Sequence, residues 1–443
     1  MSGRDGPTDA EMTKRLEKRL DGISKLDKRF NRSGTGVVKV SGSSKLQLER
    51  AVNSGVSSDK KTPDPKDGFP QVDLDASKSN GTTKGNKPTA ANSIAFDIVC
   101  ATPVALAVPE LISFYSANDV GYVANVQIGT PPRNFSILMD SGSSDFWVGG
   151  EACVTGADSG GGCVRMVSHP DSSNHSNLFP MAQGNHTFLG PKSSSTFRND
   201  TELTWGIIYG TGFVTGSLIT DNVRIAGLVM NNYTFGASVA ESSEFTDSFT
   251  MDGLMGLAKG VISNQRVPTP VEALAQKGLI NQAITSYKIS RLADGLNDGE
   301  ITFGGLDQSK FDPSTLVTVD SVDSGDTAGF WEAPFTVCVD GKSLGLINRT
   351  AILDTGSTLI TAPDDDVKAI HAKIPGSKID PQDPKNYIIP CTNTAVVSFK
   401  FGGRAFDINP LDLAFFPVDE KNLKGDCYSG FSAGTVVNAT QWL

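Results

Sequence analysis

Histidine, cysteine and long apolar runs are scarce in this chain of 443 residues, and each scarcity excludes a class of function. The chain has 4 His and no HExxH sequence, so zinc-peptidase and Ser-His-Asp mechanisms lack the parts that they need. The 6 Cys form no CxxC pair, which disfavours zinc and redox sites as well. They are also too few for a disulfide-scaffolded miniprotein. The chemistry of the chain therefore has to rest on other side chains.

Signals for a membrane or for export are also weak. The main apolar stretch, residues 98–112, contains two Pro and is too short to span a bilayer, so we expect no stable membrane span. The first ten residues lack the apolar core of a signal peptide. Asn-x-Ser/Thr acceptors are nevertheless frequent, which suits a secreted or vacuolar glycoprotein. These acceptors are Asn31, Asn80, Asn134, Asn174, Asn185, Asn199, Asn232, Asn348 and Asn438.

The net charge of −10 is unevenly distributed along the chain. Residues 1–112 contain 18 Lys and Arg against 14 Asp and Glu, whereas the remainder contains 21 against 35. An acidic body argues against binding to nucleic acid or to an anionic membrane surface. A basic leader ahead of an acidic body either docks on that body or is a solvated tail.

The composition and hydrophobic periodicity of the sequence change twice along the chain. Residues 11–30 have a charged helical pattern that ends near the dibasic pair Lys28-Arg29, and residues 31–95 are polar and aperiodic, as in a linker. From about residue 113, short alternating runs broken by Gly, Asn and Asp predict mainly β structure. One helix is expected over residues 270–280.

One pattern occurs twice in this β-rich region. ILMDSGSSDFWV begins at residue 137 and AILDTGSTLIT at residue 351, and both combine apolar residues, Asp, a hydroxyl side chain, Gly and Ser. A single Asp-Ser/Thr-Gly triplet is expected by chance in roughly one chain in five of this length, whereas two copies with matching flanks are a strong signal. Each copy predicts a strand that runs into a tight turn. Pseudo-symmetric halves would bring the two turns, with Asp140 and Asp354, face to face.

With these triplets the sequence resembles a pepsin-like aspartic protease from about residue 113 to its end. Other motifs of that family follow in family order, namely VQIGTPP, FWVG with Trp147, SSSTF at 193–197, YGTGFVTG at 209–216, DGLMGLA at 252–258 and FGGLD at 303–307. The resemblance implies a mainly β, bilobal fold with two pseudo-symmetric lobes and a central cleft. Its parts are a largely disordered basic leader over 1–112, a first lobe over 113–290 and a second lobe over 291–443. Cys153 and Cys163 enclose a Gly-rich loop and are expected to form a local disulfide, and the resemblance includes the pair Cys391–Cys427. Cys100 and Cys338 have no evident partner in the sequence.

The chemistry of this family requires two acids, because carboxylates in hydrogen-bond contact cannot both ionise cheaply and therefore share one proton. The resemblance assigns this pair to Asp140 and Asp354. One carboxylate would take a proton from a water molecule as the water attacks the scissile carbonyl, and the protonated partner would donate to the carbonyl oxygen. No metal or cofactor is implied. Protein and peptide chains are the expected substrates of a monomeric enzyme.

The resemblance also implies roles for residues around the acids. Gly142 and Gly356 would let backbone N–H groups approach the carboxylates, and Ser141 and Thr355 would link the two loops. Tyr209 at the flap tip would close over the substrate, with Trp147 as its hydrogen-bond partner. Gly210 and Gly212 would permit the flap turn. The remaining expected substrate-binding residues are Thr211, Ser143, Ser357, Thr358, Phe245, Met251 and Leu254, of which the last three are either pocket-lining or ordinary core.

Other patterns lead to weaker hypotheses. YGTGFVTG contains GxG without the βαβ context of a dinucleotide site, and LDTGSTLIT lacks the Lys and the membrane spans of an ion-pumping ATPase. His169, His175 and His186 fall in one polar insertion, but loop histidines are usually solvated and we expect no metal site. Two triplets in one chain contradict a retroviral-type homodimer.

Two departures from the family pattern lead to further expectations. The family continues for roughly thirty residues beyond the point matched by residues 438–443, so we expect the strand of Asp354 to lack a backing strand, and its lobe to be poorly folded and weakly active. A non-catalytic, peptide-binding member of the same fold is the alternative function. The leader is longer than a usual propeptide, and we expect part of it to be removed on activation, with Lys28-Arg29 as one cleavage point.

Overall fold

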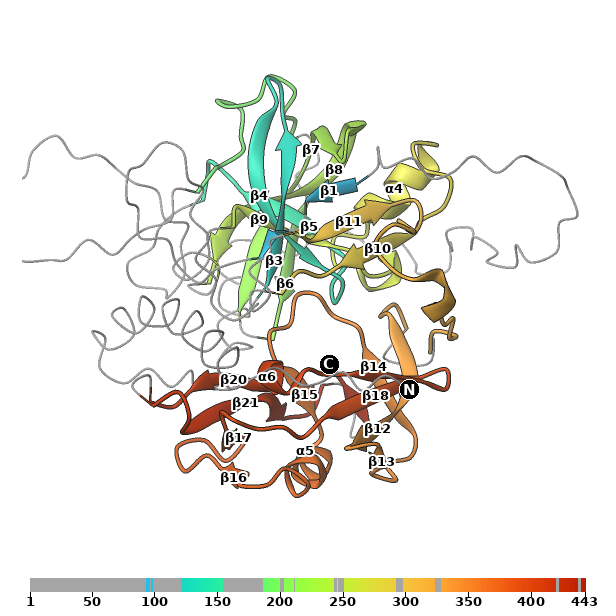
Figure 1. Ribbon diagram of the computed structural model, residues 1–443. Coiled ribbons are helices and arrows are strands. Elements are labelled where there is room, and N and C mark those ends of the chain that lie inside the picture. The colour runs from blue at the N-terminus through green and yellow to red at the C-terminus, as the bar shows by residue number, and fades with distance from the viewer. Residues whose placement is uncertain are drawn as a thin grey trace, which may run out of the picture.

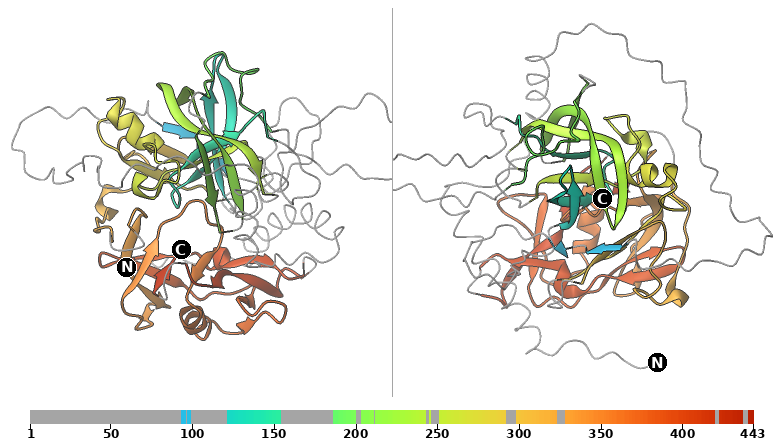
Figure 2. Two further views of the ribbon diagram at one scale, coloured as in Figure 1. Left: turned by 180° about the vertical axis from the view of Figure 1, so that it is seen from behind. Right: turned by 90° about the horizontal axis from the view of Figure 1, so that it is seen from above.

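The computed structural model describes residues 93–95, 97–98, 121–153, 186–199, 203–210, 212–242, 245, 251–291, 298–322, 328–419, 422–436 and 440–443. Several expectations lie outside these residues: the disorder of the leader, the helix over 11–30, Cys100, Cys163, His169, His175 and Thr211. Figure 1 shows two β-rich lobes, with β3 to β9 in the upper lobe and β12 to β21 in the lower. The view from behind in Figure 2 shows the same division. The expected bilobal β fold is thus confirmed.

The first lobe is built on one large sheet in which β3 also pairs with β7, so that the sheet folds back on itself. Strand β4 buries Phe135, Ile137 and Met139 at every second position, as a strand with one face on a core must. In spatial order the strands are β2 (Asp97–Ile98), β3 (Tyr122–Ile128), β4 (Arg133–Asp140), β9 (Gly253–Gly256), β5 (Phe146–Gly149), β8 (Leu228–Glu241), β7 (Phe213–Ile225) and β6 (Thr204–Ile208).

The second lobe combines two smaller sheets. Phe335, Phe431 and Trp442 are buried together in its core. The first sheet has the order β19 (Arg404–Asp407), β18 (Val397–Phe401), β12 (Glu332–Val339), β14 (Arg349–Ile352) and β22 (Gln441–Trp442), with β13 (Lys342–Ser343) on β12. The second has the order β15 (Ile360–Ala362), β21 (Asp426–Ala433), β17 (Asn386–Pro390) and β16 (Lys378–Ile379), with β20 (Ala414–Pro417) on β21.

A further sheet contains a segment that we assigned to the leader. Its order is β1 (Ser93–Ala95), β11 (Glu300–Phe303) and β10 (Thr285–Lys288). Ile301 and Phe303 of β11 are buried in the core of the first lobe. Described residues upstream of 113 therefore already belong to the folded body, which corrects the expected start of the first lobe.

The helices of the described residues are short. Helix α4 (Pro270–Gln276) confirms the predicted helix, and begins at a capping box in which Thr269 and Glu272 bond to each other's backbone N–H groups. Gly278 follows it with a φ of 68°, which an L side chain rarely adopts. The sequence interpretation missed α5 (Asp364–His371). The other short helices are η2 (Gly260–Ile262), η4 (Pro313–Thr315) and α6 (Pro410–Leu413).

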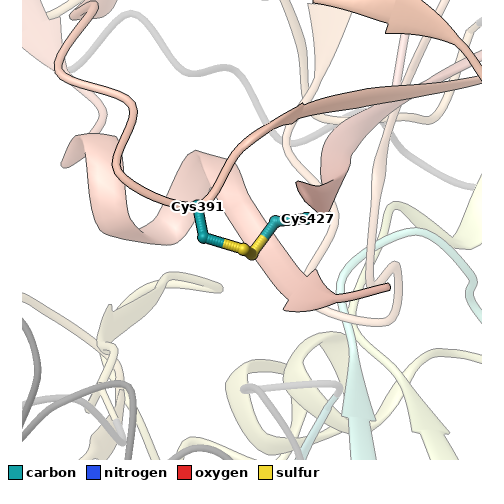
Figure 3. The surroundings of a disulfide bond; sticks show 2 residues. All are labelled: Cys391 and Cys427. Atoms are coloured by element: carbon teal, nitrogen blue, oxygen red, sulfur yellow. A yellow bond between two sulfur atoms is a disulfide. The ribbon is translucent and has the colours of Figure 1, made fainter. Parts of the chain in front are cut away.

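The disulfide Cys391–Cys427 is present as expected and ties the end of β17 to β21, with Cα atoms 4.9 Å apart (Figure 3). Cys153 is disulfide-bonded, but the partner that we expected for it lies outside the described residues. Cys338 is a free thiol on β12. None of the helices in the described part of the chain has the length and apolar character needed to cross a membrane.

Candidate active site

The two acid-bearing loops begin at equivalent places in the two lobes. In the first lobe β4 ends at Asp140, and β9 lies parallel to it with Gly256 opposite Asp140. In the second lobe β14 ends two residues before Asp354. Asp140 is thus itself part of a hydrogen-bonded ladder, whereas Asp354 follows the end of its ladder by two residues.

Ser141 and Thr355 join the two loops by reciprocal hydrogen bonds. The Ser141 N–H donates to Thr355 Oγ1 at 3.1 Å, and the Thr355 N–H donates to Ser141 Oγ at 2.9 Å. Each hydroxyl also donates to the opposite strand, Ser141 Oγ to the Leu353 carbonyl at 2.7 Å and Thr355 Oγ1 to the Met139 carbonyl at 2.6 Å. Four hydrogen bonds therefore fix the relative position of two loops that are more than two hundred residues apart in sequence.

Each carboxylate accepts hydrogen bonds from equivalent donors in its own loop, a Gly N–H and a Ser hydroxyl. Asp140 accepts from the Gly142 N–H at 2.8 Å through Oδ1 and from Ser143 Oγ through Oδ2. Asp354 accepts from the Gly356 N–H at 2.7 Å and from Ser357 Oγ at 2.7 Å. The matching donor sets orient both carboxyl planes and stabilise charge on them.

The two glycines allow each acid to touch the opposite loop. A Cβ on Gly142 would lie 2.4 Å from Cγ of Asp354, and a Cβ on Gly356 would lie 2.5 Å from Oδ1 of Asp140. The same Cβ on Gly356 would lie 3.2 Å from Oδ1 of Asp354, so the inner oxygens of both acids lie close to one point. Any side chain at either glycine would push the two acids apart.

The electrostatics of Asp140 reflect this contact. Its side chain is buried, and burial together with the charge of Asp354 raises the pKa of the Asp140 carboxyl well above its usual value. A hydrogen bond between the two carboxyl groups acts in the same direction, while the donors Ser143 and Gly142 act against it. Asp140 therefore retains a proton under conditions in which an exposed Asp would be ionised.

A strand does back the second loop, which corrects our expectation that Asp354 would have none. Strand β22 pairs in parallel with β14, with Trp442 opposite Ala351, in the place that β9 takes beside β4. Leu443 also exchanges backbone hydrogen bonds with Thr361. The pairing reaches Ala351 and does not reach Asp354, and Leu353 is 54% exposed where its first-lobe counterpart, Met139, is 0% exposed.

The flap is the hairpin of β6 and β7, closed by a bond from the Tyr209 N–H to the Gly212 carbonyl at 2.7 Å. Trp147 Nε1 donates to the Tyr209 hydroxyl at 2.8 Å, as expected. Burial and the charge of Asp140 raise the pKa of the Tyr209 phenol, so the flap tip lies within electrostatic reach of the acids. A Cβ on Gly210 would meet no atom within 4 Å, so packing within the chain does not require glycine there.

Phe245, Met251 and Leu254 lie together in an apolar cluster with Trp147 and the partly buried Tyr209. The Phe245 ring contacts the Trp147 and Tyr209 rings edge-on, with centroids 5.5 and 5.3 Å apart. All three expected pocket residues are themselves buried, so they form the packed support of the flap tip. Their contact with a substrate stays a prediction.

The sequence interpretation missed the role of Asp145, and the structure does not test the expected role of Thr358. Asp145 is 1% exposed and accepts from the Ser263 hydroxyl at 2.6 Å and from the N–H groups of Asn264 and Gln265 at 3.0 Å each, which fixes the turn before β5. An acid directly ahead of the apolar run FWV was the available signal. Thr358 is exposed, and its role stays a prediction.

Metal ligands do not gather in the described ranges: no group of three or more His, Cys, Asp or Glu side chains is placed to hold an ion there. His186, the one described member of the expected histidine cluster, bonds to the Met251 carbonyl at 2.8 Å and lies 3.9 Å from Asp252. Its surroundings are those of a structural side chain.

Comparisons with known proteins agree with this geometry. A family model described as "Eukaryotic aspartyl protease" matches residues 121–441. The chain is 31% identical over 295 residues to the aspartic-type endopeptidase ctsD of Aspergillus fumigatus, covering 66% of this chain and 55% of that protein. It is 34% identical over 322 residues to rhizopuspepsin-1 of Rhizopus niveus, covering 72% of each, and 30% identical over 332 residues to human napsin-A, covering 73% of this chain and 70% of napsin-A.

The chain thus spans a little over half the length of the first of these relatives. The matched region contains both acid-bearing loops, the flap and the described parts of both lobes between residues 121 and 441. From the extent of that match, the chain belongs to the eukaryotic aspartyl protease family.

Proposed function

We propose that this chain is an aspartic endopeptidase that hydrolyses peptide bonds at acid pH with Asp140 and Asp354 as its catalytic pair. The observation that carries the proposal is the crossed arrangement of the loops, in which each acid lies against the glycine of the opposite loop. The raised pKa of Asp140 supports it, because a pair that shares one proton contains both an acid and a base.

The proposed reaction uses that shared proton. The ionised carboxylate removes a proton from a water molecule as its oxygen forms a bond to the scissile carbonyl carbon, and the protonated carboxyl donates to the carbonyl oxygen. A neutral tetrahedral gem-diol results, and no bond forms to the protein. The C–N bond then breaks as the carboxyl that took the proton from water donates it to the leaving amine, while the other carboxylate takes a proton from a gem-diol hydroxyl. The pair again holds one proton, and a new carboxyl and a new amino terminus are released.

Substrate contacts are assigned to the flap and to the loops. Tyr209 would close over the bound chain and exclude water, with its hydroxyl held by Trp147. The open space at Gly210 supports a close approach of substrate backbone to the flap. The expected substrate-binding residues are Ser143, Ser357, Thr358, Gly210, Thr211, Gly212, Phe245, Met251 and Leu254.

The wider assignments are also part of the proposal. We assign most of residues 113–290 to the first lobe and most of 291–443 to the second, but β1, β2 and β11 also belong to the first lobe, so those expected bounds are corrected there. Most of the chain before residue 93 is assigned to a removable leader. The enzyme would act as a monomer on protein and peptide substrates in a secreted or vacuolar compartment. The fungal and animal relatives named above support the peptidase assignment by similarity.

A peptide-binding protein without catalysis is the second candidate, and one observation favours it. The Leu353 side chain beside Asp354 is 54% exposed, whereas its counterpart Met139 beside Asp140 is fully buried. A less firmly packed second loop would keep the cleft but orient its carboxyl group less well.

Denatured haemoglobin incubated with the protein near pH 3 to 5, with and without a statine-type transition-state analogue, separates the two candidates. Cleavage that the analogue blocks supports the peptidase, and the variants Asp140→Asn and Asp354→Asn should abolish it. Tight binding of the analogue without cleavage supports the peptide-binding protein. Cleavage that persists in both variants would overturn the assignment of the acids.

A further inference from the structure

Residues 93–95 and 97–98 form strands of the folded body although they lie far upstream of the first acid-bearing loop. Strand β1 pairs antiparallel with β11, with Ser93, Ile94 and Ala95 opposite Thr302, Ile301 and Glu300. Strand β2 then pairs antiparallel with β3, with Asp97 opposite Val123 and Ile98 opposite Tyr122. One short segment therefore bridges two different sheets.

The sheet that receives β1 depends on it for its outer edge. Without β1, the described part of this sheet would be the hairpin of β10 and β11, and two strands alone are marginally stable. Strand β11 would then expose a row of unpaired N–H and C=O groups. Its inward residues Ile301 and Phe303 belong to the first-lobe core, so fraying of this edge would reach that core.

The sheet that receives β2 lies next to the same hairpin. The Tyr122 hydroxyl, from the first residue of β3, donates to the Ser290 carbonyl just beyond β10 at 3.1 Å. Strand β1 pairs with β11, the neighbour of β10, and strand β2 pairs with β3, which begins at Tyr122. The two strands thus link the end of the first-lobe sheet to the strands that lead into the second lobe.

From this placement we infer that residues 93–98 remain in the mature enzyme, so that the cut which releases the basic leader lies N-terminal to Ser93. The inference rests on the proposed function in so far as the leader is a removable propeptide. Cleavage there adds one water molecule across one peptide bond and creates a new amino terminus. The dibasic pairs Lys28-Arg29 and Lys60-Lys61 both lie in the permitted stretch.

A cut placed on either side of the segment tests the inference without reference to peptidase activity. Two full-length chains, both carrying Asp140→Asn to prevent self-cleavage, receive the same site for a sequence-specific protease, one after residue 88 and the other after residue 106. Each protein is cut, the fragments are separated by chromatography, and the unfolding temperature is compared with that of the same protein before cutting.

We expect the upstream cut to leave the unfolding temperature within about 1 °C of the uncut protein. The downstream cut should lower it by about 3 °C or more once the fragment is removed, because five strand residue pairs are lost. A fragment that stays bound to the body through chromatography after the downstream cut also supports the inference. Equal unfolding temperatures after both cuts, with the fragment removed, would overturn it.

The natural amino terminus gives a second readout. Sequencing of the wild-type protein after its leader has been removed should find a terminus at or before Ser93. A terminus between residues 99 and 121, with no peptide from 93–98 bound, would contradict the inference even if that protein is an active peptidase.

Discussion

Ser141 and Thr355 each accept a hydrogen bond from the other's backbone N–H, although they belong to different lobes. Ser141→Ala would leave the Thr355 N–H and the Leu353 carbonyl without these partners, at about 1–3 kcal/mol for each group that becomes buried and unpaired. We expect kcat/KM to fall at least tenfold and the urea midpoint to decrease. Ser141→Thr keeps the hydroxyl and is the matched control. Wild-type kinetics for the alanine variant would show that the loops are held in another way.

Gly142→Ala tests the crossed contact of the acids. Its Cβ would lie 2.4 Å from Cγ of Asp354, so the acids must separate, and a displacement near 1 Å costs about 100-fold in rate. Gly430→Ala is the control, because a Cβ there meets its nearest atom at 3.5 Å, an ordinary contact. We expect the first variant to lose peptidase activity by at least about 100-fold and to remain folded by circular dichroism. Comparable activity of both variants would contradict the crossed geometry.

Tyr209→Phe removes the acceptor of the Trp147 N–H while keeping the ring that contacts Phe245. Trp147 is buried, so its donor would be left unpaired, and the flap tip would be held less firmly. We expect kcat/KM to decrease about tenfold with the unfolding temperature nearly unchanged. Trp147→Phe removes the donor as well and should give no larger loss when combined with Tyr209→Phe. Additive losses in the double variant would mean that the two side chains act separately.

Glu241 makes the first lobe sensitive to rising pH. It is buried at the end of β8, accepts from Ser238 Oγ at 2.5 Å and lies near Asp252, and burial raises its pKa from 4.5 to about 7. The unfolded chain releases this proton near pH 4.5 and the folded chain near pH 7. The folded state is therefore favoured below pH 4.5, and about 3 kcal/mol of that stability is lost as the pH rises to about 7.

Glu241→Gln should remove this dependence. Urea unfolding of the variant and of the wild type at pH 4 to 8 should show the wild type losing stability relative to the variant between pH 4.5 and 7. Parallel profiles across that range would show that Glu241 is ionised in the folded protein like an ordinary Glu.

His371 gives the second lobe the opposite dependence. The buried ring bonds to the Val367 carbonyl at 2.7 Å and to Ser429 Oγ at 2.8 Å, and burial lowers its pKa from 6.5 to about 4. The unfolded chain takes up a proton below pH 6.5, so this contribution to stability is present above pH 6.5 and is lost as the pH falls to about 4. An NMR titration of the imidazole should have its midpoint near pH 4. A midpoint near 6.5 would contradict it.

The parts that could be predicted from the sequence are those in which the chemistry demands a particular residue. Asp140 and Asp354 lie in repeated triplets, and the glycines beside them are needed for contacts that no other residue permits. Three sequence features predict the start of helix α4, namely the Thr269 cap, the Pro that follows it and Glu272 three residues after the cap.

The remainder depends on tertiary pairing that leaves little local trace. Strand β22 is two residues long and exists because β14 lies beside it, and β1 is three residues long in a stretch whose composition is that of a linker. Helix α5 begins with three consecutive Asp, which stabilise a helix N-terminus but also suit a loop. Asp145 is explained by the loop at 263–265, which packs against it from more than a hundred positions away.

The contacts of Gly142 with Asp354 and of Gly356 with Asp140 have a mechanical consequence. Since each acid touches the opposite lobe at the loop, any rigid rotation of one lobe relative to the other has its axis near the acids. We therefore expect the outer rims of the two lobes to move more than the two carboxyl groups when ligands of different bulk bind in the proposed cleft. Complexes with thin and thick inhibitors should differ in interlobe angle but not in the separation of these carboxyl oxygens.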